Sequence, residues 1–392
     1  MAERVGIVGA GTMGSGIAEV CLRAGKQVRL SDVDAGALEN ARERILQGLD
    51  GAVARARLSA RQRDTALASL ELVETLAGAA QGSGIVIETA VEDLDVKQAI
   101  FRELDKVTTA ETVLATNTSS LSVADCAAMT RRPQRVLGLH FFNPAPRMAL
   151  VELVLTERTD VATSERAADF VETLGKTVVR CADAPGFIVN RVGRPYLLEA
   201  VRMLEAGEAS VVAIDAALES AGYPMGPFRL MDLIGLDVDV AIDRTLQDAF
   251  DGAPRFEPPR LERQLAEQGR LGRKSGHGFY RYGPDGHATP RTEIRLEVLS
   301  ETPLHPADIV ERLELGVINE AYRAVGEGVA AAPDIDTAMR LGAGHPRGPF
   351  ERVDELGLRH IVVRLRVLHE AADPGAAERF EVAPSLWQMA TV

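Results

Sequence analysis

The chain has 392 residues, of which 46% are hydrophobic and 26% charged, with 35 glycines and 19 prolines. This composition is typical of a globular protein with two or three folded units, and it excludes disordered and collagenous classes. The net charge of −13 excludes a function built on nonspecific nucleic-acid binding, because neutralising phosphates requires a basic face.

Targeting and cysteine patterns point to the cytoplasm. No apolar run approaches the roughly 18 residues of a membrane-spanning helix, and residues 1–10 pass directly into the strand-like VGIV, which leaves no room for a signal peptide. Cys21, Cys126 and Cys181 are scattered and lack CxxC spacing, so we expect reduced structural thiols and no metal site. We therefore expect a cytoplasmic protein that binds neither membrane nor metal.

The first half of the chain alternates apolar, β-branched runs with helical stretches, which predicts a doubly wound parallel sheet of Rossmann type. The expected strands are residues 5–8, 28–31, 85–88, 113–115, 136–139 and 151–155. Residues 35–77 are too long for a simple crossover, and their Ala, Leu, Arg and Glu content indicates a helical excursion, such as a hairpin of two helices.

A second, all-α domain is expected after Asp183, and it is duplicated. Residues 222–237 read GYPMGPFRLMDLIGLD and residues 344–359 read GHPRGPFERVDELGLR, with eight of sixteen positions identical. Glu199-Ala200 likewise matches Glu320-Ala321. Two copies are too few for a solenoid, so a packing unit has been duplicated. The expected organisation is residues 1–183, 184–281, a Pro- and Gly-rich linker at 282–306, and a second copy at 307–392.

The loop GAGTMG at residues 9–14 is a dinucleotide-binding fingerprint, in which Gly9, Gly11 and Gly14 follow a strand and open a helix. We include Thr12 and Met13 of this loop among the cofactor contacts. Asp32 ends the second strand, where a carboxylate can bind the ribose hydroxyls and repel a 2′-phosphate, so the pattern favours NAD over NADP. The alternative to a cofactor loop is a glycine-rich turn that binds no ligand. FAD-binding proteins share the fingerprint, but nothing else in the sequence indicates a flavin site.

Four polar residues lie where strands or helices begin or end: Ser119, His140, Glu152 and Asn190. His140 closes the strand RVLGLH at the carboxyl edge of the sheet, where such folds bind ligands, and Glu152 follows twelve residues later. This pair suits a general base and its orienting carboxylate. Each residue also has a structural alternative, since Ser119 and Asn190 could cap helices, Glu152 could be an edge carboxylate and His140 a core histidine.

These motifs carry a resemblance that spans nearly the whole chain. GAGTMG, AVEDLDVK, NTSSL, GLHFFNPAP, LVEL, DAPGFIVNR, GYPMGPF and KSGHGFY stand in the order and spacing of the L-3-hydroxyacyl-CoA dehydrogenase family, in particular its bacterial 3-hydroxybutyryl-CoA members. The resemblance implies NAD-dependent, reversible oxidation of a short-chain (S)-3-hydroxyacyl-CoA to the 3-ketoacyl-CoA. It also implies an active site in the cleft between the dinucleotide-binding and helical domains.

The resemblance further assigns roles to residues. It implies His140 as general base oriented by Glu152, with Ser119 and Asn190 around the reacting oxygen. It implies cofactor contacts from Asp32, Glu92, Lys97, Ser119, Asn143 and Lys274, although Lys97 and Lys274 could also be solvated surface residues. For the acyl-CoA substrate it points to the helical excursion, where Arg55 and Arg57 either pair with CoA phosphates or form a solvated face.

The chain departs from the basic form of this family by continuing past Tyr282 into the second copy, where Glu311 occupies the position of Asn190. We expect that copy to pack rather than catalyse. It could occupy the place of a partner subunit, giving a pseudo-dimeric monomer instead of a homodimer. Because no hydratase-like domain precedes Met1, we do not expect a bifunctional complex.

Two rival functions remain open on the residues alone. One is a dehydrogenase of a free hydroxy acid, such as gulonate or carnitine, on the same two-domain plan, against which HFFNP argues. The other is a non-catalytic scaffold, against which the retention of all four polar residues argues.

Overall fold

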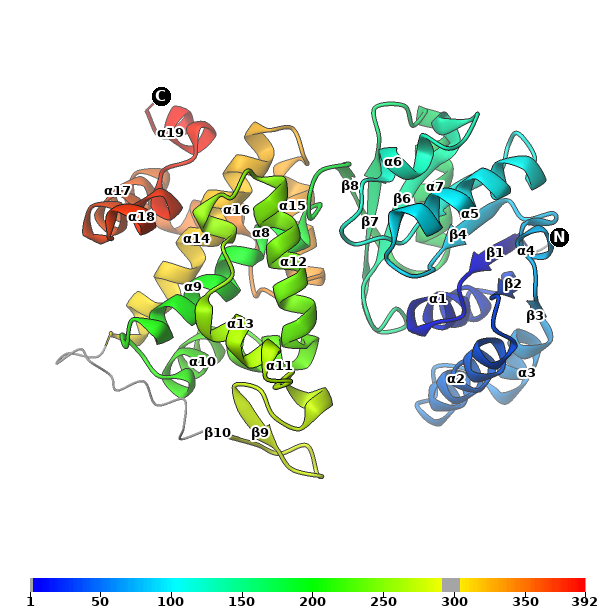
Figure 1. The fold of residues 1–392 in the computed structure, drawn as a ribbon, viewed down its shortest axis with the longest axis horizontal. Coiled ribbons are helices and arrows are strands. Elements are labelled where there is room, and N and C mark those ends of the chain that lie inside the picture. The colour runs from blue at the N-terminus through cyan, green and yellow to red at the C-terminus, as the bar shows by residue number, and fades with distance from the viewer. Residues whose placement is uncertain (1–2, 291–303, 392) are drawn as a thin grey trace. The chain divides into compact units, whose positions relative to one another are not determined.

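The computed structural model describes residues 3–290 and 304–391, which form two compact units that divide between Phe187 and Ile188 (Figure 1). The N-terminal unit is an α/β sheet protein and the C-terminal unit is helical, which confirms the predicted fold class. In the described ranges, no helix is both long and apolar enough to cross a membrane.

The N-terminal unit is built on one eight-stranded sheet in the order β3-β2-β1-β4-β5-β6-β7-β8. Its strands are β1 (Arg4–Val8), β2 (Gln27–Ser31), β3 (Leu70–Val73), β4 (Ile85–Glu88), β5 (Val113–Thr116), β6 (Val136–Phe141), β7 (Leu150–Leu155) and β8 (Thr177–Ala182). Its helices are α1 (Thr12–Arg23), α2 (Ala35–Ala54), α3 (Ala60–Ala68), α4 (Leu76–Ala80), α5 (Leu94–Val107), α6 (Val123–Ala127) and α7 (Val161–Thr173).

The expectation of a wholly parallel sheet is wrong at one point. The six strands from β3 to β6 are parallel, but β7 runs antiparallel to β6, and β8 runs parallel to β7. The connection from Phe141 to Leu150 is too short for a helical crossover, which parallel strands require. The chain therefore reverses direction at this place, and β8, which the sequence analysis did not predict, extends the reversed edge.

The helical excursion is also corrected. The two predicted helices exist as α2 and α3, and a capping box formed by Ser59 and Gln62 begins the second one. The end of the segment is a strand, because Leu70–Val73 pairs in parallel with β2 and forms the opposite edge of the sheet. Its four residues are only partly buried or exposed, and this short, mixed pattern resembles a helix end in sequence.

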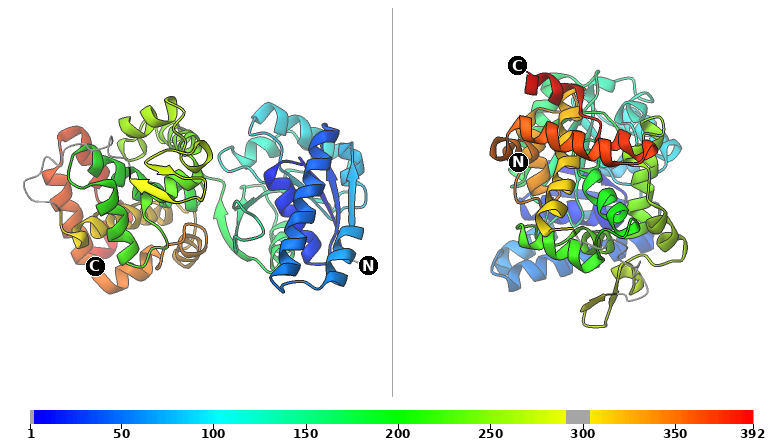
Figure 2. Two further views of the ribbon diagram at one scale, coloured as in Figure 1. Left: turned by 90° about the horizontal axis from the view of Figure 1, so that it is seen from below. Right: turned by 90° about the vertical axis from the view of Figure 1, so that its left-hand side faces the viewer.

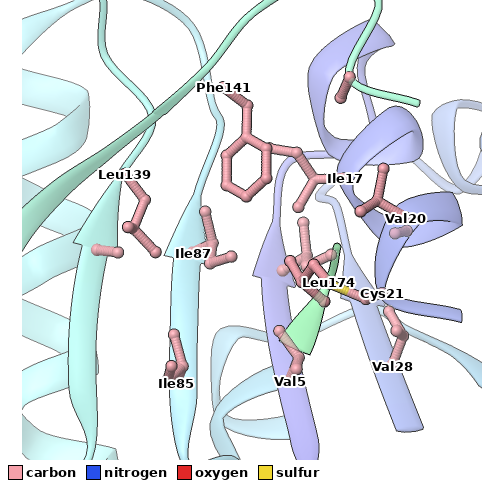
Figure 3. Close-up of a cluster of buried hydrophobic side chains, with 14 of the residues drawn as sticks. Val5, Ile17, Val20, Cys21, Val28, Ile85, Ile87, Leu139, Phe141 and Leu174 are labelled. Atoms are coloured by element: carbon pink, nitrogen blue, oxygen red, sulfur yellow. The ribbon is translucent and has the colours of Figure 1, made fainter. Parts of the chain in front are cut away.

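The sheet is covered by helices on both sides. A core of buried side chains joins α1, α2 and α7 to one face, as Figure 3 shows for Ile17, Val20 and Cys21 against Val5 and Ile87. Helices α4 to α6 pack on the other side. Within the described residues the three cysteines are buried thiols that form no disulfide, as predicted, and burial raises the pKa of the Cys21 and Cys126 thiols to about 12.

The C-terminal unit holds two successive sets of helices (Figures 1 and 2). The first set is α8 (Val189–Val192), α9 (Arg194–Glu205), α10 (Val211–Ser220), α11 (Pro227–Ile234), α12 (Leu236–Ala249) and α13 (Arg260–Glu267). The second is α14 (Pro306–Gly326), α15 (Ala332–Leu341), α16 (Pro349–Leu356), α17 (Leu358–Ala371), α18 (Pro374–Ala377) and α19 (Pro384–Thr391). Within the predicted linker, β10 (Ala288–Pro290) pairs with β9 (Tyr280–Tyr282) as a hairpin, and residues 291–303 lie outside the described residues.

One local device occurs in both sets. Asp215 of α10 accepts a hydrogen bond from the Phe228 amide at 3.0 Å, and Asp336 of α15 accepts one from the Phe350 amide at 2.8 Å. The close approach needs a residue without a side chain just before α11 and α16, since a Cβ on Gly348 would lie 2.2 Å from the Asp336 Oδ1 atom. The repeated GxPxGPF sequence thus encodes the same helix-to-helix clamp twice.

The two sets face one another through α9 and α14, and their contacts are reciprocal. Arg191 pairs with Glu320 at 2.7 Å, and Arg312, the counterpart of Arg191, pairs with Glu199, the counterpart of Glu320, at 2.7 Å. A Cβ on Gly316 would lie 3.0 Å from Pro195, which is its own counterpart in α9. Such self-complementary contacts are the signature of an isologous interface, here formed between two halves of one unit.

The clamp in the second set can be tested with Gly348→Ala. The new methyl group would press on the Asp336 carboxylate, and overpacking of this kind lowers the free energy of unfolding by about 1–3 kcal/mol. Thermal unfolding followed by circular dichroism should therefore show a lower Tm. The matched control is Gly375→Ala, where a Cβ would meet no atom within 4 Å, and this variant should keep its Tm. An unchanged Tm in both variants would contradict the steric account.

Candidate active site

The glycine loop between β1 and α1 has the three separate features that a pyrophosphate site needs. Gly9 has a φ of +102°, which favours glycine, and a Cβ on Gly14 would lie 1.8 Å from the Gly9 carbonyl oxygen. A Cβ on Gly11, by contrast, would meet no atom within 4 Å. Gly9 and Gly14 therefore serve the turn and the helix packing, whereas Gly11 leaves open space over the loop.

The backbone amides of this loop can bind an anion. A carboxylate, that of Asp32, lies beside them. In the described part of the chain, no side chain caps the start of α1, so its first-turn amides point outward with the positive end of the helix dipole. The Asp32 Oδ2 atom accepts the Ala10 amide at 2.7 Å, which fixes the carboxylate at the end of β2. These residues fit a dinucleotide whose pyrophosphate lies over Gly11 and whose ribose reaches Asp32.

Arg44 is a member of this site that the sequence analysis missed. From α2, its guanidinium donates to the Ala10 carbonyl at 2.7 Å and to the Ser15 hydroxyl at 3.1 Å. The Ala10 peptide is thus held on one side by Asp32 and on the other by Arg44. Arg44 is one of two exposed arginines on the long helix α2, so the sequence carries no signal that distinguishes it from Arg42.

His140 and Glu152 form a buried pair across the reversed strands. They are direct register partners of β6 and β7, and the His140 Nδ1 atom lies 2.6 Å from the Glu152 Oε2 atom. Glu152 has no exposed surface and His140 is 6% exposed. A carboxylate can only accept, so Nδ1 carries the proton and Nε2 is left as a base. The rings of Phe142 and Phe187 lie 4.5 and 5.7 Å from the imidazole and form its apolar surroundings.

Glu92 and the loop after β5 form a second polar group at the carboxyl ends of the strands. The Glu92 carboxylate accepts hydrogen bonds from the Thr118 hydroxyl, from the Ser119 amide at 3.2 Å and from the Ser120 hydroxyl at 2.9 Å. Burial alone would raise the pKa of Glu92, but these bonds and the nearby Lys97 charge hold that pKa below its usual value. Glu92 therefore stays ionised and fixes the Ser119 backbone.

Lys97 is not a solvated surface residue, because its side chain is only 1% exposed. Its ammonium lies 2.8 Å from Glu88, which ends β4, and 3.4 Å from Glu92. Glu88, which the sequence analysis missed, also accepts from the Thr116 hydroxyl and the Ala90 amide. The signal for it was a carboxylate ending an otherwise apolar strand. Glu88 and its partners thus join α5 to the carboxyl ends of β4 and β5.

The remaining predicted site residues lie at or near the surface of the two units. Asn143 is exposed and precedes a cis proline, and Arg55 and Arg57 are exposed just after the end of α2. In the C-terminal unit, Asn190 lies half-buried in α8, and Lys274 is exposed and paired with Asp237 at the start of α12. In the second copy, Glu311 occupies the position equivalent to Asn190, and its carboxylate binds His360 at 2.6 Å and Arg364 at 2.7 Å.

Comparison with protein families gives two matches that together cover most of the chain. Residues 4–184 match the model described as "3-hydroxyacyl-CoA dehydrogenase, NAD binding domain". Residues 186–282 and, again, residues 309–391 match the model described as "3-hydroxyacyl-CoA dehydrogenase, C-terminal domain". The chain belongs to the 3-hydroxyacyl-CoA dehydrogenase family. Family membership makes it an NAD-dependent oxidoreductase, as the sequence predicted.

Two relatives in this family show how the match extends. The 3-hydroxybutyryl-CoA dehydrogenase of Mycobacterium tuberculosis is 48% identical over 283 residues, which cover 71% of this chain and 98% of the relative. The 3-hydroxyadipyl-CoA dehydrogenase of Escherichia coli K12 is 36% identical and covers 99% of this chain and 97% of the relative. The first relative corresponds to a chain with one helical copy, and the second spans both copies.

Among solved structures, the 3-hydroxybutyryl-CoA dehydrogenase of Escherichia coli K12 superimposes with a TM-score of 0.89 at 35% identity, covering 100% of this chain and 98% of that chain. The duplicated helical region is therefore shared with a solved member of the family. These matches favour the acyl-CoA branch over a dehydrogenase of a free hydroxy acid.

The different roles of Gly11 and Gly14 predict different outcomes for the same change. Gly11→Ala adds a methyl group in open space, so the free energy of unfolding should change by no more than about 0.5 kcal/mol, as for an ordinary surface substitution, while NADH binding weakens by at least about tenfold. Gly14→Ala drives a methyl group into the Gly9 carbonyl and should lower the Tm. NADH fluorescence titration and thermal unfolding measure the two effects. Equal behaviour of both variants would contradict these assignments.

Proposed function

We propose that the protein oxidises a short-chain (S)-3-hydroxyacyl-CoA, of the 3-hydroxybutyryl-CoA type, to the 3-ketoacyl-CoA and runs the reverse reaction. The buried His140–Glu152 pair at the carboxyl edge of a dinucleotide-binding sheet is the observation that carries this proposal. The names and reactions of the relatives in the same family support the substrate class.

His140 acts as the general base in this proposal. Its Nε2 atom takes the proton of the 3-hydroxyl, while NAD, when bound, accepts the hydride from the same carbon. The imidazolium that forms is stabilised by Glu152 at 2.6 Å, and the apolar rings around it strengthen this ion pair by keeping water away. In the reductive direction the imidazolium returns the proton to the oxygen. Ser119 and Asn190 donate to that oxygen and orient it.

We infer that the cofactor is held by the loop residues Gly9, Gly11, Thr12, Met13 and Gly14 together with other polar side chains. Those side chains are Asp32, Glu92, Lys97, Ser119, Asn143 and Lys274. Support for Asp32 comes from its fixed position beside the loop amides. Lys97 acts through Glu92 and Glu88, because its ammonium is already paired with both carboxylates.

The CoA part of the substrate would meet the arm formed by α2 and α3. Arg55 and Arg57 are exposed beyond the end of α2, where guanidinium groups can pair with phosphates. We further propose that the enzyme acts in the cytoplasm and is a pseudo-dimeric monomer. The reciprocal Arg191–Glu320 and Arg312–Glu199 pairs support the second point, because they satisfy within one chain the contacts that a homodimer would make between two.

Turnover is tested by following NADH absorbance with purified protein and acetoacetyl-CoA, with free acetoacetate as the control substrate. We expect oxidation of NADH with the thioester only. Turnover of the free acid instead of the thioester would overturn the proposal, as would the absence of turnover with short and longer acyl thioesters.

The base and its partner are tested by substitution. His140→Gln removes the base and should lower kcat by about 10²–10⁴-fold. Glu152→Gln removes the charge that stabilises the imidazolium and should lower kcat by at least about tenfold. His369→Gln, at an exposed histidine of the second copy, is the matched control and should leave kcat unchanged. Equal activity of all three variants would exclude His140 as the base.

The oligomeric state is tested by sedimentation velocity at several protein concentrations. The expected result is a single species of about 42 kDa, the mass of one chain. A dimer that persists on dilution and dissociates in an Arg312→Ala variant would contradict the pseudo-dimeric monomer.

A further inference from the structure

Four charged side chains are buried together between three helices of the first helical copy. Arg194 of α9 lies 2.9 Å from Asp239 and 3.3 Å from Asp243, which are one turn apart on α12, and the buried Glu262 of α13 interacts electrostatically with both aspartates. None of the four is more than 4% exposed. We call these four residues the ionic cluster. With one guanidinium and three carboxyl groups, it is not electrically balanced when all are ionised.

The second copy shows what the same fold looks like without the ionic cluster. The equivalent helices, α14, α17 and α19, carry Leu315, Ile361, Leu365 and Leu386 at the four positions. All four are buried, at 1% exposure or less, and belong to one apolar core. The chain thus contains its own comparison, in which a charged set and an aliphatic set occupy equivalent places.

Comparing the two copies shows whether the helical fold itself requires the buried charges. Burying charges carries a desolvation penalty, and well-packed aliphatic residues in their place are often neutral or stabilising. The second copy forms the same helices with the aliphatic set, so the helical fold itself does not require the charges. A buried ionic network that the fold does not require points to a functional reason for its presence.

The ionic cluster lies close to the two candidate site residues of the C-terminal unit, because Asn190 is in α8, which directly precedes α9, and Lys274 pairs with Asp237 in the first turn of α12. Arg194 lies one turn after Asn190, at the start of α9, and Asp239 lies in the first turn of α12, next to the Asp237–Lys274 pair. In the second copy, Glu311 and Arg359 replace Asn190 and Asp237. The ionic cluster, Asn190 and the Asp237 partner of Lys274 are therefore present together in the first copy, and the second copy has other residues at these positions.

We propose that the ionic cluster is a positioning device for catalysis, which fixes the start of α9 relative to the start of α12 and thereby sets Asn190 and Lys274. Its four members are positioning residues, since they act through these two side chains. The Arg194–Asp239 hydrogen bond is directional, and together with the ion pair to Asp243 it restricts the relative rotation and translation of α9 and α12, whereas an aliphatic core tolerates small shifts. The inference rests on the proposed function, because it takes its site residues from there.

The ionic cluster also makes the stability of the protein depend on pH. Burial raises the pKa of Asp239 to about 6 and of Asp243 to about 7, and it raises that of Glu262 as well, because ionising three clustered carboxyls would leave uncompensated charge. The folded state therefore binds more protons than the unfolded chain, and the stability contributed by the protonated forms is lost as the pH rises from about 4 through about 7. The other charged groups facing the ionic cluster are Arg202 of α9, Asp232 of α11 and Asp237 of α12.

The test gives the first copy the side chains of the second, in the variant R194L/D239I/D243L/E262L of the full-length protein. We expect kcat to fall and the KM for NADH to rise, with kcat/KM lowered about tenfold to a hundredfold, because helix shifts below 1 Å misplace the site residues. The Tm should stay equal or rise, and its excess over the wild type should grow from pH 4 to 8. Loss of activity without loss of stability is the readout that a purely structural role would not give.

Two further variants complete the test. I361V/L365I makes two conservative changes at equivalent positions in the core of the second copy and should leave kcat/KM unchanged. E262Q keeps the shape of the carboxyl group but cannot ionise, so its Tm relative to the wild type should rise with pH, and it should bind NADH as the wild type does at pH 6. Full kcat/KM in the folded quadruple variant would overturn the inference, and so would failure of both it and E262Q to fold.

The proposed function is tested by a different result from the one that tests the positioning role. It is contradicted if the wild type does not turn over acyl thioesters. The effect of the quadruple variant on NADH affinity, measured by fluorescence titration, is independent of turnover and still decides the inference. An unchanged NADH affinity together with an unchanged kcat would leave the ionic cluster without a positioning role.

Discussion

The reversal of chain direction between β6 and β7 is the constraint on which the active site depends. In an antiparallel pair, residues on facing strands lie directly opposite one another, and the register places His140 against Glu152. A parallel neighbour would have required a long crossover and would not have given a short-range partner from the same segment. The buried 2.6 Å contact therefore follows from one tight connection in the chain, and the surrounding strands hold it rigidly.

The other elements of the N-terminal unit bring anionic and cationic groups to the same edge of the sheet. Glu88 ends β4 and neutralises Lys97, and Glu92 then binds the loop that follows β5. Because each carboxylate is held by several donors, the loops between the strands are fixed by hydrogen bonds rather than by apolar packing. This arrangement keeps the polar groups in place at the carboxyl edge of the sheet, as a site that must hold fixed geometry requires.

The sequence predicted where the candidate site residues lie better than it predicted the edges of the fold. The glycine loop and Asp32 lie at the ends of β1 and β2, and His140 and Glu152 are opposite one another on β6 and β7, while the roles assigned to them stay predictions. Leu70–Val73 and β8 were missed, since edge strands are short and only partly buried and so lack clear periodicity. Arg44 could not be recognised, because its role comes from contacts with residues far apart in the sequence, whereas Glu88 was missed although a carboxylate that ends an apolar strand is a signal.

The reciprocal contacts between the two helical copies also bear on how such an enzyme can change over evolutionary time. In a symmetric dimer, any substitution at the interface appears twice and meets its own copy near the axis. In one chain each half mutates alone, so Tyr223 can stack on Tyr196 while its counterpart His345 meets both rings from the other side. Fusion therefore frees the interface from self-complementarity, and one half can lose its catalytic groups while the other keeps them.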